Sequence, residues 1–302
     1  MTKTLTQVGE FGLIERMKRH VRVTPGVCKG IGDDAAVLTV TPGMRLVLTT
    51  DMLVEDVHFT RDMKAESVGQ KAMACNVSDI AAMGAVPRYA VVSLGVPGAL
   101  PLRYVDGLYR GMNRLAEKFA VAIVGGDTVS SEKIVLNIAL TGEAKDKDLV
   151  YRHGAKAGDG IFVTGPLGRS FSTGRHLTFT PRLKESQFLV RHYPPHAMID
   201  ISDGLTADLG HILTESRVGA LLDETAIPRA RGASLAEALS DGEDFELLFT
   251  VSAARTKRLL ACGHPGMRFY KIGEIVCARE GLTLQDCHGQ RRPLPRRGYV
   301  HF

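Results

Sequence analysis

The stretch ESVGQKAMACNVSDIAAMGAVPRYAVVSLGV, residues 66–96, decides how the first half of the chain folds. Residues 66–84 place Met73, Val77 and Ile80 at the spacing of one helix face, which predicts an α-helix. Residues 89–96 are rich in apolar and β-branched side chains and predict a strand. The first half therefore interleaves helices with strands.

The same alternation continues on both sides of this stretch. In the first half we expect strands at residues 45–50, 121–124 and 133–141 and a helix at residues 101–119. In the second half we expect strands at residues 161–164, 245–251 and 267–276 and a helix at residues 204–216. A charged, glycine-containing stretch at residues 143–160 separates the halves, and the length of 302 residues suits two domains. We therefore expect domains at residues 1–147 and 148–302.

Composition excludes several classes of protein. The chain is 44% hydrophobic and 24% charged, as soluble globular proteins are. Its apolar stretches are strand-sized, far below the ~18 residues of a membrane helix, and its first residues lack the apolar core of a signal peptide. We expect a cytoplasmic protein with no membrane partner.

Charge and cysteine content point the same way. The net charge is only +5, and no aromatic residues interleave with basic ones, so we expect no nucleic-acid partner. The basic run Arg291, Arg292, Arg296 and Arg297 has the ordinary interpretation of a solvated tail. The five cysteines include no CxxC pair, which favours free thiols in a reducing compartment.

The usual nucleotide motifs are absent from the sequence. There is no GxxxxGK[ST] phosphate loop and no HRD or DFG kinase motif. Residues 30–35, GIGDDA, fit a dinucleotide-binding turn, but residues 35–42 predict a strand where that motif needs a helix. Two carboxylates in the turn would also repel a pyrophosphate unless metal ions stood between them.

What remains is a set of aspartates at Gly-, Ser- and Thr-rich turns and at element ends: Asp33, Asp34, Asp51, Asp79, Asp127, Asp200 and Asp203. Taken singly, each has an ordinary alternative. Asp51 could end a strand, Asp127 could serve in a turn, and Asp203 with Ser202 could cap the helix at Gly204. If they converge, divalent cations must neutralise them, and an all-oxygen ligand set favours Mg²⁺ or Ca²⁺. Such cations could then hold a polyphosphate.

Asp79 is the hardest of these residues to explain by structure alone. On an ideal helix it points in the direction of Ala72 and Met83, whereas Lys71 and Ser78 mark the expected solvated direction. Asp79 is thus expected to point into a partly buried place. Burying a carboxylate is costly without a partner, and a metal ion would be a sufficient one.

The motifs GIGDDAAV, TTDMLVEDVHF, NVSDIAAMGAVP, GGDT, YRHGAKAGD, VTGPLG, MIDISDGLTADLGHI and DGEDFELLFTV occur in this order. The ordered set resembles the thiamine-monophosphate kinase family, within the superfamily of aminoimidazole ribonucleotide synthetase and selenophosphate synthetase, over residues 9–302. TTDMLVEDVHF and the terminal RRGYVHF point to this family rather than to its cousins. After VTGPLGRS the chain is shorter than the family pattern.

The resemblance implies ATP-dependent phosphorylation of thiamine monophosphate to thiamine diphosphate by direct transfer, without a phosphoenzyme. It implies a two-domain α+β fold with an N-terminal α/β sandwich that binds ATP and several Mg²⁺ ions and pairs through its sheet into a homodimer. The C-terminal α+β domain then lies on the substrate side. Another ATP-dependent enzyme of the superfamily, or a non-catalytic nucleotide or metal sensor, is the alternative, and the intact acidic set argues against the sensor.

The resemblance also assigns residues. The metal ligands would be Asp34, Thr49, Thr50, Asp51, Asp79, Asp127, Asp200 and Asp203, among which Asp51, Asp79, Asp127 and Asp203 would be catalytic. The ATP side would be Tyr109, Gly126, Asp127, Arg152 and Ser202. The substrate side would be His58, Glu243 and Tyr299.

The chemistry of these residue types suits such a reaction. A substrate phosphate oxygen is already deprotonated at neutral pH, so the transfer needs charge shielding rather than a strong base. Glu243 could neutralise a thiazolium cation and Tyr299 could stack on it. The ordinary alternatives are a surface histidine for His58 and a C-terminal packing aromatic for Tyr299. The acids of both halves are expected to face one cleft.

Overall fold

The computed structural model describes Arg16, Arg19 and residues 26–29, 37–262, 264 and 266–299. Asp33 and the predicted ligand Asp34 lie outside the described residues. The chain divides into two compact units, Met1–Ile80 with Val86–Asp146 and Ala81–Ala85 with Lys147–Phe302. Among the described residues, no helix is long and apolar enough to span a membrane.

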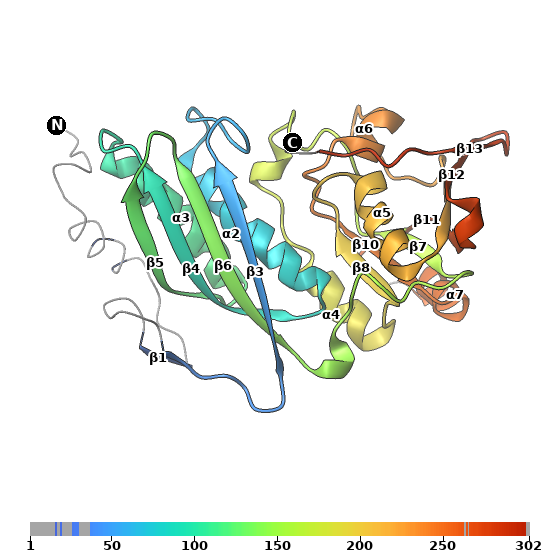
Figure 1. The fold of residues 1–302 in the computed structure, drawn as a ribbon, viewed down its shortest axis with the longest axis horizontal. Coiled ribbons are helices and arrows are strands. Elements are labelled where there is room, and N and C mark those ends of the chain that lie inside the picture. The colour runs from blue at the N-terminus through green and yellow to red at the C-terminus, as the bar shows by residue number, and fades with distance from the viewer. Residues whose placement is uncertain are drawn as a thin grey trace. The chain divides into compact units, whose positions relative to one another are not determined.

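The N-terminal unit is built on a four-stranded sheet in the order β3-β6-β4-β5 (Figure 1). Its strands are β3 (Arg45–Val54), β4 (Val86–Val96), β5 (Ala122–Ser130) and β6 (Val135–Ala144). Strand β6 pairs antiparallel with both β3 and β4, while β4 and β5 are parallel. Two short strands, β1 (Val27–Lys29) and β2 (Val37–Leu38), form a separate antiparallel pair.

Two helices, α2 (Ala65–Ala82) and α3 (Leu102–Lys118), cover one face of this sheet (Figure 1). Glycine lets the two helices approach closely. A Cβ added at Gly69 on α2 would lie 2.0 Å from the carbonyl oxygen of Leu108, and one at Gly111 on α3 would lie 1.9 Å from that of Glu66. A side chain at either position would force the helices apart.

The solvated direction that we expected for α2 is wrong. Lys71 is 0% exposed and its Nζ donates to the backbone oxygen of His58 at 3.0 Å, and Ser78 is also buried. Asp79 itself is half-buried. The helix packs on α3 through Gly69 and on the sheet through Ile80, so several of its sides are covered at once. An amphipathic pattern assumes one covered side and therefore misplaces the solvent.

Asp51 and Asp127 both lie inside strands, which contradicts the strand-end and turn alternatives. Strand β3 continues three residues past Asp51 to Val54, and β5 runs through Asp127 to Ser130. Both strands are at an edge of the sheet. An edge strand has neighbours on one side only, and a carboxylate in it keeps access to solvent or to a ligand.

The C-terminal unit contains a seven-stranded mixed sheet in the order β13-β12-β9-β11-β7-β10-β8. Its strands are β7 (Gly160–Val163), β8 (Ala197–Asp200), β9 (Gly219–Asp223), β10 (Leu247–Val251), β11 (Tyr270–Val276), β12 (Leu282–Gln285) and β13 (Arg291–Pro293). Its helices are α4 (Leu183–His192), α5 (Leu205–Ser216), α6 (Leu235–Ser240) and α7 (Ala253–Cys262), and short 3₁₀ turns are η1 (Asp146–Asp148), η2 (Arg175–Leu177) and η3 (Ala278–Glu280).

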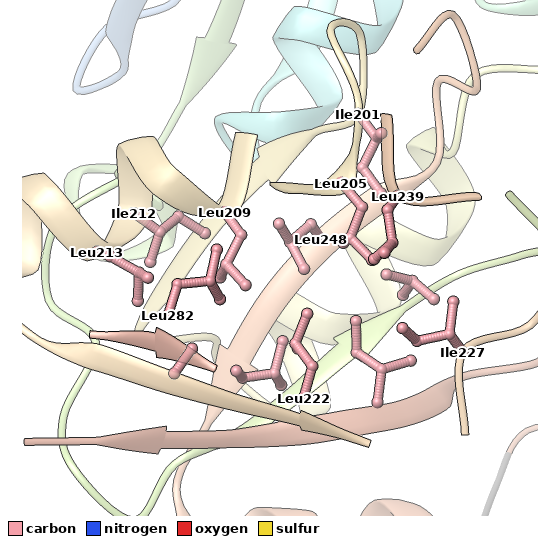
Figure 2. Close-up of a cluster of buried hydrophobic side chains, with 14 of the residues drawn as sticks. Ile201, Leu205, Leu209, Ile212, Leu213, Leu222, Ile227, Leu239, Leu248 and Leu282 are labelled. Carbon is pink, nitrogen blue, oxygen red and sulfur yellow. The ribbon is translucent and has the colours of Figure 1, made fainter. Parts of the chain in front are cut away.

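Helices cover both faces of this sheet, and alternate residues of its inner strands therefore belong to different cores. On β10, Leu248 joins a cluster with Leu205, Leu209 and Ile212 of α5, which Figure 2 shows. Its neighbour Phe249 joins a second cluster with residues of α4 and α7. The two units together confirm the expected two-domain mixed α/β architecture.

The basic C-terminal run is not a free tail. Arg291 and Arg292 lie in β13, which pairs with β12. The Nη1 of Arg296 donates to Thr214 Oγ1 at 2.7 Å, and the backbone N–H of Arg297 donates to Thr206 Oγ1 at 3.1 Å. The arginines are exposed, as expected, yet the segment packs back on α5.

Among the described residues, Cys75, Cys262, Cys277 and Cys287 form no disulfide.

Candidate functional site

In the N-terminal unit, the structure brings Thr49 and Asp79 into contact. The hydroxyl of Thr49 on β3 donates to Asp79 Oδ2 on α2 at 2.5 Å. Asp51 lies two residues further along β3, on the same face of the strand as Thr49. The sheet and the helix thus place oxygen donors from residues 30 positions apart side by side.

Thr50 and Asp127 are placed differently from this pair. Thr50 points to the other face of β3, where its hydroxyl donates to Asn137 Oδ1 at 3.0 Å. Asp127 lies on the opposite edge strand from Asp51, three strand spacings or about 14 Å away. One Mg²⁺, with ligand distances of about 2.1 Å, cannot bind both of these aspartates of one subunit directly. Within one subunit, a role of both in metal binding therefore requires more than one ion.

Two residues expected on the ATP side have structural explanations of their own. A Cβ added at Gly126 would lie 2.0 Å from the carbonyl oxygen of Val92, so strand packing alone requires glycine there. Tyr109 is buried in α3, and this burial raises the pKa of its hydroxyl above the usual value. A contact of either residue with ATP stays a prediction.

His58 has a fixed ring orientation. Its Nδ1 accepts a hydrogen bond from the backbone N–H of Val54 at 3.1 Å. Because Nδ1 accepts, the ring carries its proton on Nε2. The residue is half-buried just after β3, so the surface interpretation describes it only partly.

In the C-terminal unit, four predicted site residues lie together around the loop before α5. The backbone N–H of Glu243 donates to the carbonyl oxygen of Ser202 at 2.6 Å, and that of Tyr299 donates to the carbonyl oxygen of Asp203 at 3.0 Å. A Cβ at Gly298 would lie 2.5 Å from the same Asp203 oxygen, so glycine permits this approach. Residues nearly 100 positions apart in sequence therefore meet at one loop.

The alternative in which Ser202 and Asp203 cap α5 is wrong. The N-cap is Gly204, with φ of 124°, and a carboxylate inside the helix reaches back instead. Asp208 Oδ2 accepts from the backbone N–H of Asp203 at 3.1 Å and from that of Gly204 at 3.0 Å. The sequence analysis missed Asp208, although its position one turn after Gly204 was a usable signal.

Negative charge is crowded at this loop. Burial, followed by the charges of Asp200 and Asp203, raises the pKa of Asp208 to about 8. Ligand atoms of Asp203, Asp208 and His211 all lie within 4.8 Å of one another. A cation would relieve this crowding, and the carboxylate oxygens suit a hard ion such as Mg²⁺. The donor set of this loop therefore fits the metal that the acids predict.

The two remaining predicted residues are also in this unit. Asp200 ends β8 and is buried opposite Leu247 of β10. Arg152 is exposed, and its carbonyl oxygen accepts from the hydroxyl of Ser216 at 3.3 Å. Each unit thus has its own group of predicted residues, and the meeting of both groups in one cleft stays a prediction.

Comparisons with known proteins support one family. Residues 32–144 match the family described as AIR synthase related protein, N-terminal domain. A thiamine-monophosphate kinase of Rhodopirellula baltica is 36% identical over 310 residues, which cover 97% of each chain.

Solved structures agree with this match. The crystal structure of thiamine-monophosphate kinase from Stenotrophomonas maltophilia is 32% identical, with a TM-score of 0.81 over 91% of this chain and 96% of that one. The structure of AaThiL complexed with AMPPCP and TMP is 33% identical, with a TM-score of 0.77 over 100% of both chains. The sequence motifs, the two-unit fold and these full-length matches lead to one conclusion: the chain belongs to the thiamine-monophosphate kinase family.

Proposed function

We propose that this protein is a thiamine-phosphate kinase, a transferase that uses ATP to phosphorylate thiamine monophosphate to thiamine diphosphate in thiamine diphosphate biosynthesis. The observation that carries the proposal is the full-length similarity to thiamine-monophosphate kinases, one of which is solved with AMPPCP and TMP. ATP is therefore the co-substrate.

The acidic residues would hold several Mg²⁺ ions. In the N-terminal unit these are Thr49, Thr50, Asp51, Asp79 and Asp127, joined by Asp34, and in the C-terminal unit Asp200 and Asp203. Bound Mg²⁺ supplies charge neutralisation between two polyanions. The hydrogen bond between Thr49 and Asp79 and the crowded charges at Asp203 and Asp208 support these assignments.

We assign the remaining side chains to binding and orientation. The backbone at Gly126 and the side chains of Arg152 and Ser202 would contact ATP, with Tyr109 near the adenine. An exposed guanidinium such as that of Arg152 can bind phosphate oxygens through two N–H groups. No general base is required, since the attacking phosphate oxygen is already ionised at neutral pH.

The substrate would be held by residues of both units. Glu243 and Tyr299 would contact the thiamine moiety, and His58 would donate its Nε2 proton to the substrate phosphate. The tautomer of His58, with Nδ1 accepting from Val54, supports the last role because it places the ring proton on Nε2, the atom that would donate.

We further propose a homodimer that forms through the open face of the N-terminal sheet. The side chains of Leu46, Leu48, Met52, Val91 and Val129 are exposed on these strands, and Leu48 is 69% exposed. Several exposed apolar side chains on one face of a sheet are typical of an interaction surface. A cytoplasmic location follows from the use of ATP and the free thiols.

The direct test is an assay of purified protein with Mg²⁺, ATP and thiamine monophosphate, in which thiamine diphosphate is measured. Formation of thiamine diphosphate with one ADP per turnover is expected. Turnover of other phosphate acceptors but not of thiamine monophosphate would favour a different enzyme of the superfamily. ATP binding without any turnover would favour a sensor.

Paired kinetics test the substrate side. Glu243→Gln removes an attraction to a fixed positive charge, and Tyr299→Ala removes stacking. Both interactions persist throughout the reaction, so each variant is expected to raise KM for thiamine monophosphate with little change in KM for ATP. Weakened ATP binding with unchanged thiamine monophosphate binding would contradict the placement.

A further inference from the structure

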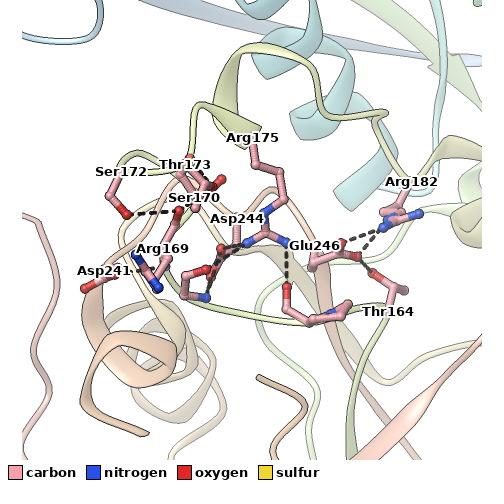
Figure 3. Close-up of polar contacts among 12 residues, drawn as sticks. Thr164, Arg169, Ser170, Ser172, Thr173, Arg175, Arg182, Asp241, Asp244 and Glu246 are labelled. Carbon is pink, nitrogen blue, oxygen red and sulfur yellow. Dashed lines mark hydrogen bonds and ion pairs between the residues drawn. The ribbon is translucent and has the colours of Figure 1, made fainter. Parts of the chain in front are cut away.

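Two segments of the C-terminal unit, residues 164–182 and residues 241–246, contact each other along their length (Figure 3). Asp241 accepts from the backbone N–H of Arg169 at 2.9 Å. Asp244 accepts from the backbone N–H of Gly168 at 2.9 Å and pairs with the guanidinium of Arg175. Glu246 accepts from the hydroxyl of Thr164 at 2.6 Å and from the guanidinium of Arg182 at 2.5 Å. The second segment is therefore fixed by the first rather than by strand pairing alone.

The fixed segment has an unusual backbone. Glu243 and Phe245 have φ of 56° and 50°, in the left-handed region that residues with a Cβ rarely adopt. The ring of Phe179 stacks on that of Phe245 at 4.2 Å between centroids. Such strain persists only where the surroundings hold it in place, as residues 164–182 do here.

Glu243 is held by His176. The Nδ1 of His176 lies 2.9 Å from Glu243 Oε2, and the histidine ring is fully buried and stacks on Phe171 at 4.5 Å. Because an ionised carboxylate only accepts, Nδ1 carries the proton of this hydrogen bond. The Glu243 side chain stays 22% exposed, so another group can still reach it.

The chemical nature of this contact differs from that of its neighbours. Asp244 and Glu246 are bound by the guanidinium groups of Arg175 and Arg182, which cancel their charge. An imidazole N–H can donate while neutral, so it orients a carboxylate without cancelling its charge. A charged, oriented and partly exposed carboxylate suits an organic cation.

We propose that His176 is a positioning residue that holds the Glu243 carboxylate in the orientation in which it binds the thiazolium ring. The proposal rests on the proposed function, in which Glu243 contacts the thiamine moiety. Fixing the glutamate rotamer before the substrate arrives removes an entropic cost from binding. Residues 164–182 supply this support through η2.

The test uses steady-state kinetics and thermal unfolding of the full-length protein. His176→Phe keeps a ring against Phe171 but removes the donor, and is expected to raise KM for thiamine monophosphate about tenfold. The kcat and KM for ATP should change less than about twofold, because the contact acts on substrate binding alone. His176→Asn restores an N–H donor and should recover most of the lost affinity.

A matched control is His196→Phe. His196 Nδ1 contacts Asp159 Oδ2 at 2.8 Å in the same unit, and neither residue is a predicted site residue. This variant should leave KM for thiamine monophosphate unchanged. A purely structural role of His176 would instead lower the unfolding temperature and change kcat and both KM values together.

A double-mutant cycle shows whether His176 acts through Glu243. In a Glu243→Gln background, His176→Phe should add little further change in KM. An unchanged KM in the single variant His176→Phe, or an equal rise in both backgrounds, would overturn the proposal. If Glu243→Gln alone leaves KM unchanged, the proposed substrate site fails as well, so the two failures are distinguishable.

Phe171→Ala covers the case in which His176→Phe does not fold. Phe171 is 45% exposed, so its removal is tolerable for folding, yet it frees the ring of His176 to move. We expect KM for thiamine monophosphate to rise severalfold. An unchanged KM in this variant would also overturn the proposal.

Discussion

The two sheets of the molecule are covered in opposite ways. In the C-terminal unit, helices pack on both faces, and neighbouring residues of β10 such as Leu248 and Phe249 enter separate cores. In the N-terminal unit, α2 and α3 cover one face, while Leu48 and Met52 stay exposed on the other. The C-terminal sheet is thus covered on both faces within its own unit, whereas the N-terminal sheet leaves apolar surface for a further contact.

Asp79 in the N-terminal unit and Asp208 in the C-terminal unit differ in their burial and in their hydrogen-bond partners. Asp79 is half-buried and hydrogen-bonded to a hydroxyl, in a place that another ligand can share. Asp208 is fully buried and bound to backbone N–H groups, so it supports the loop around Asp203. We therefore expect substitution of Asp79 to affect activity and substitution of Asp208 to affect stability.

The largest effect is expected for Asp79→Asn. Loss of one charge aimed at bound metal should lower kcat on the order of 100- to 1000-fold, and added Mg²⁺ should not restore it. Thermal unfolding should stay close to that of the unaltered protein. Asp62→Asn, at an exposed aspartate outside the predicted site, is the control. Near-normal turnover of Asp79→Asn at saturating Mg²⁺ would remove Asp79 from the metal site.

The next effect is the loss of stability in Leu209→Ala. Leu209 is buried in the core between α5 and the C-terminal sheet, and such truncations cost about 2–5 kcal/mol. Leu46→Ala, on the open N-terminal face, should lower the stability of the separated subunit by no more than about 0.5 kcal/mol. Urea unfolding measures both. Equal losses would mean that the two sheets are not covered differently.

A smaller effect is expected for Leu48→Asp. A charge on the open face should weaken a dimer at least about tenfold while leaving each subunit folded. Leu260→Asp, at an exposed leucine of α7, is the matched control. Light scattering over a range of concentrations gives the oligomeric state. A monomeric starting protein with full activity would refute pairing through this face.

The last effect concerns pH. The pKa of Asp208 is 3.8 in an unfolded chain and about 8 in the folded one, so the folded state binds more protons between these values. The free energy of unfolding should therefore fall, by about 1 kcal/mol per pH unit, as pH rises from about 4 to about 8. Asp208→Asn keeps an oxygen acceptor without the charge and should lack this slope.

Urea titrations at pH 5 and pH 8, without divalent metal, measure the difference between these two proteins. We expect the difference in the free energy of unfolding to grow as the pH rises, with Asp208→Asn the more stable protein at pH 8. Parallel pH dependence in both proteins would show that Asp208 is ionised in the folded state.

Local patterns predicted a large part of the secondary structure. Residues 66–84 and 101–119 were expected as helices and correspond to α2 (Ala65–Ala82) and α3 (Leu102–Lys118). The strand expected at residues 245–251 begins only at Leu247, after the left-handed backbone at Phe245. Helix α6 was not predicted, although Ser234 and Glu237 have the spacing of a capping box and form one in the structure.

The sequence by itself determined the helices and long strands of the N-terminal unit, the two-part division and the set of acidic residues, because periodicity and motif order are properties of neighbouring residues. Only the tertiary structure decided that Lys71 is buried, that Asp208 supports the loop of Asp203, and that His176 contacts Glu243. Those outcomes depend on residues far apart in the chain, whose burial and hydrogen bonds exist only after the segments have packed.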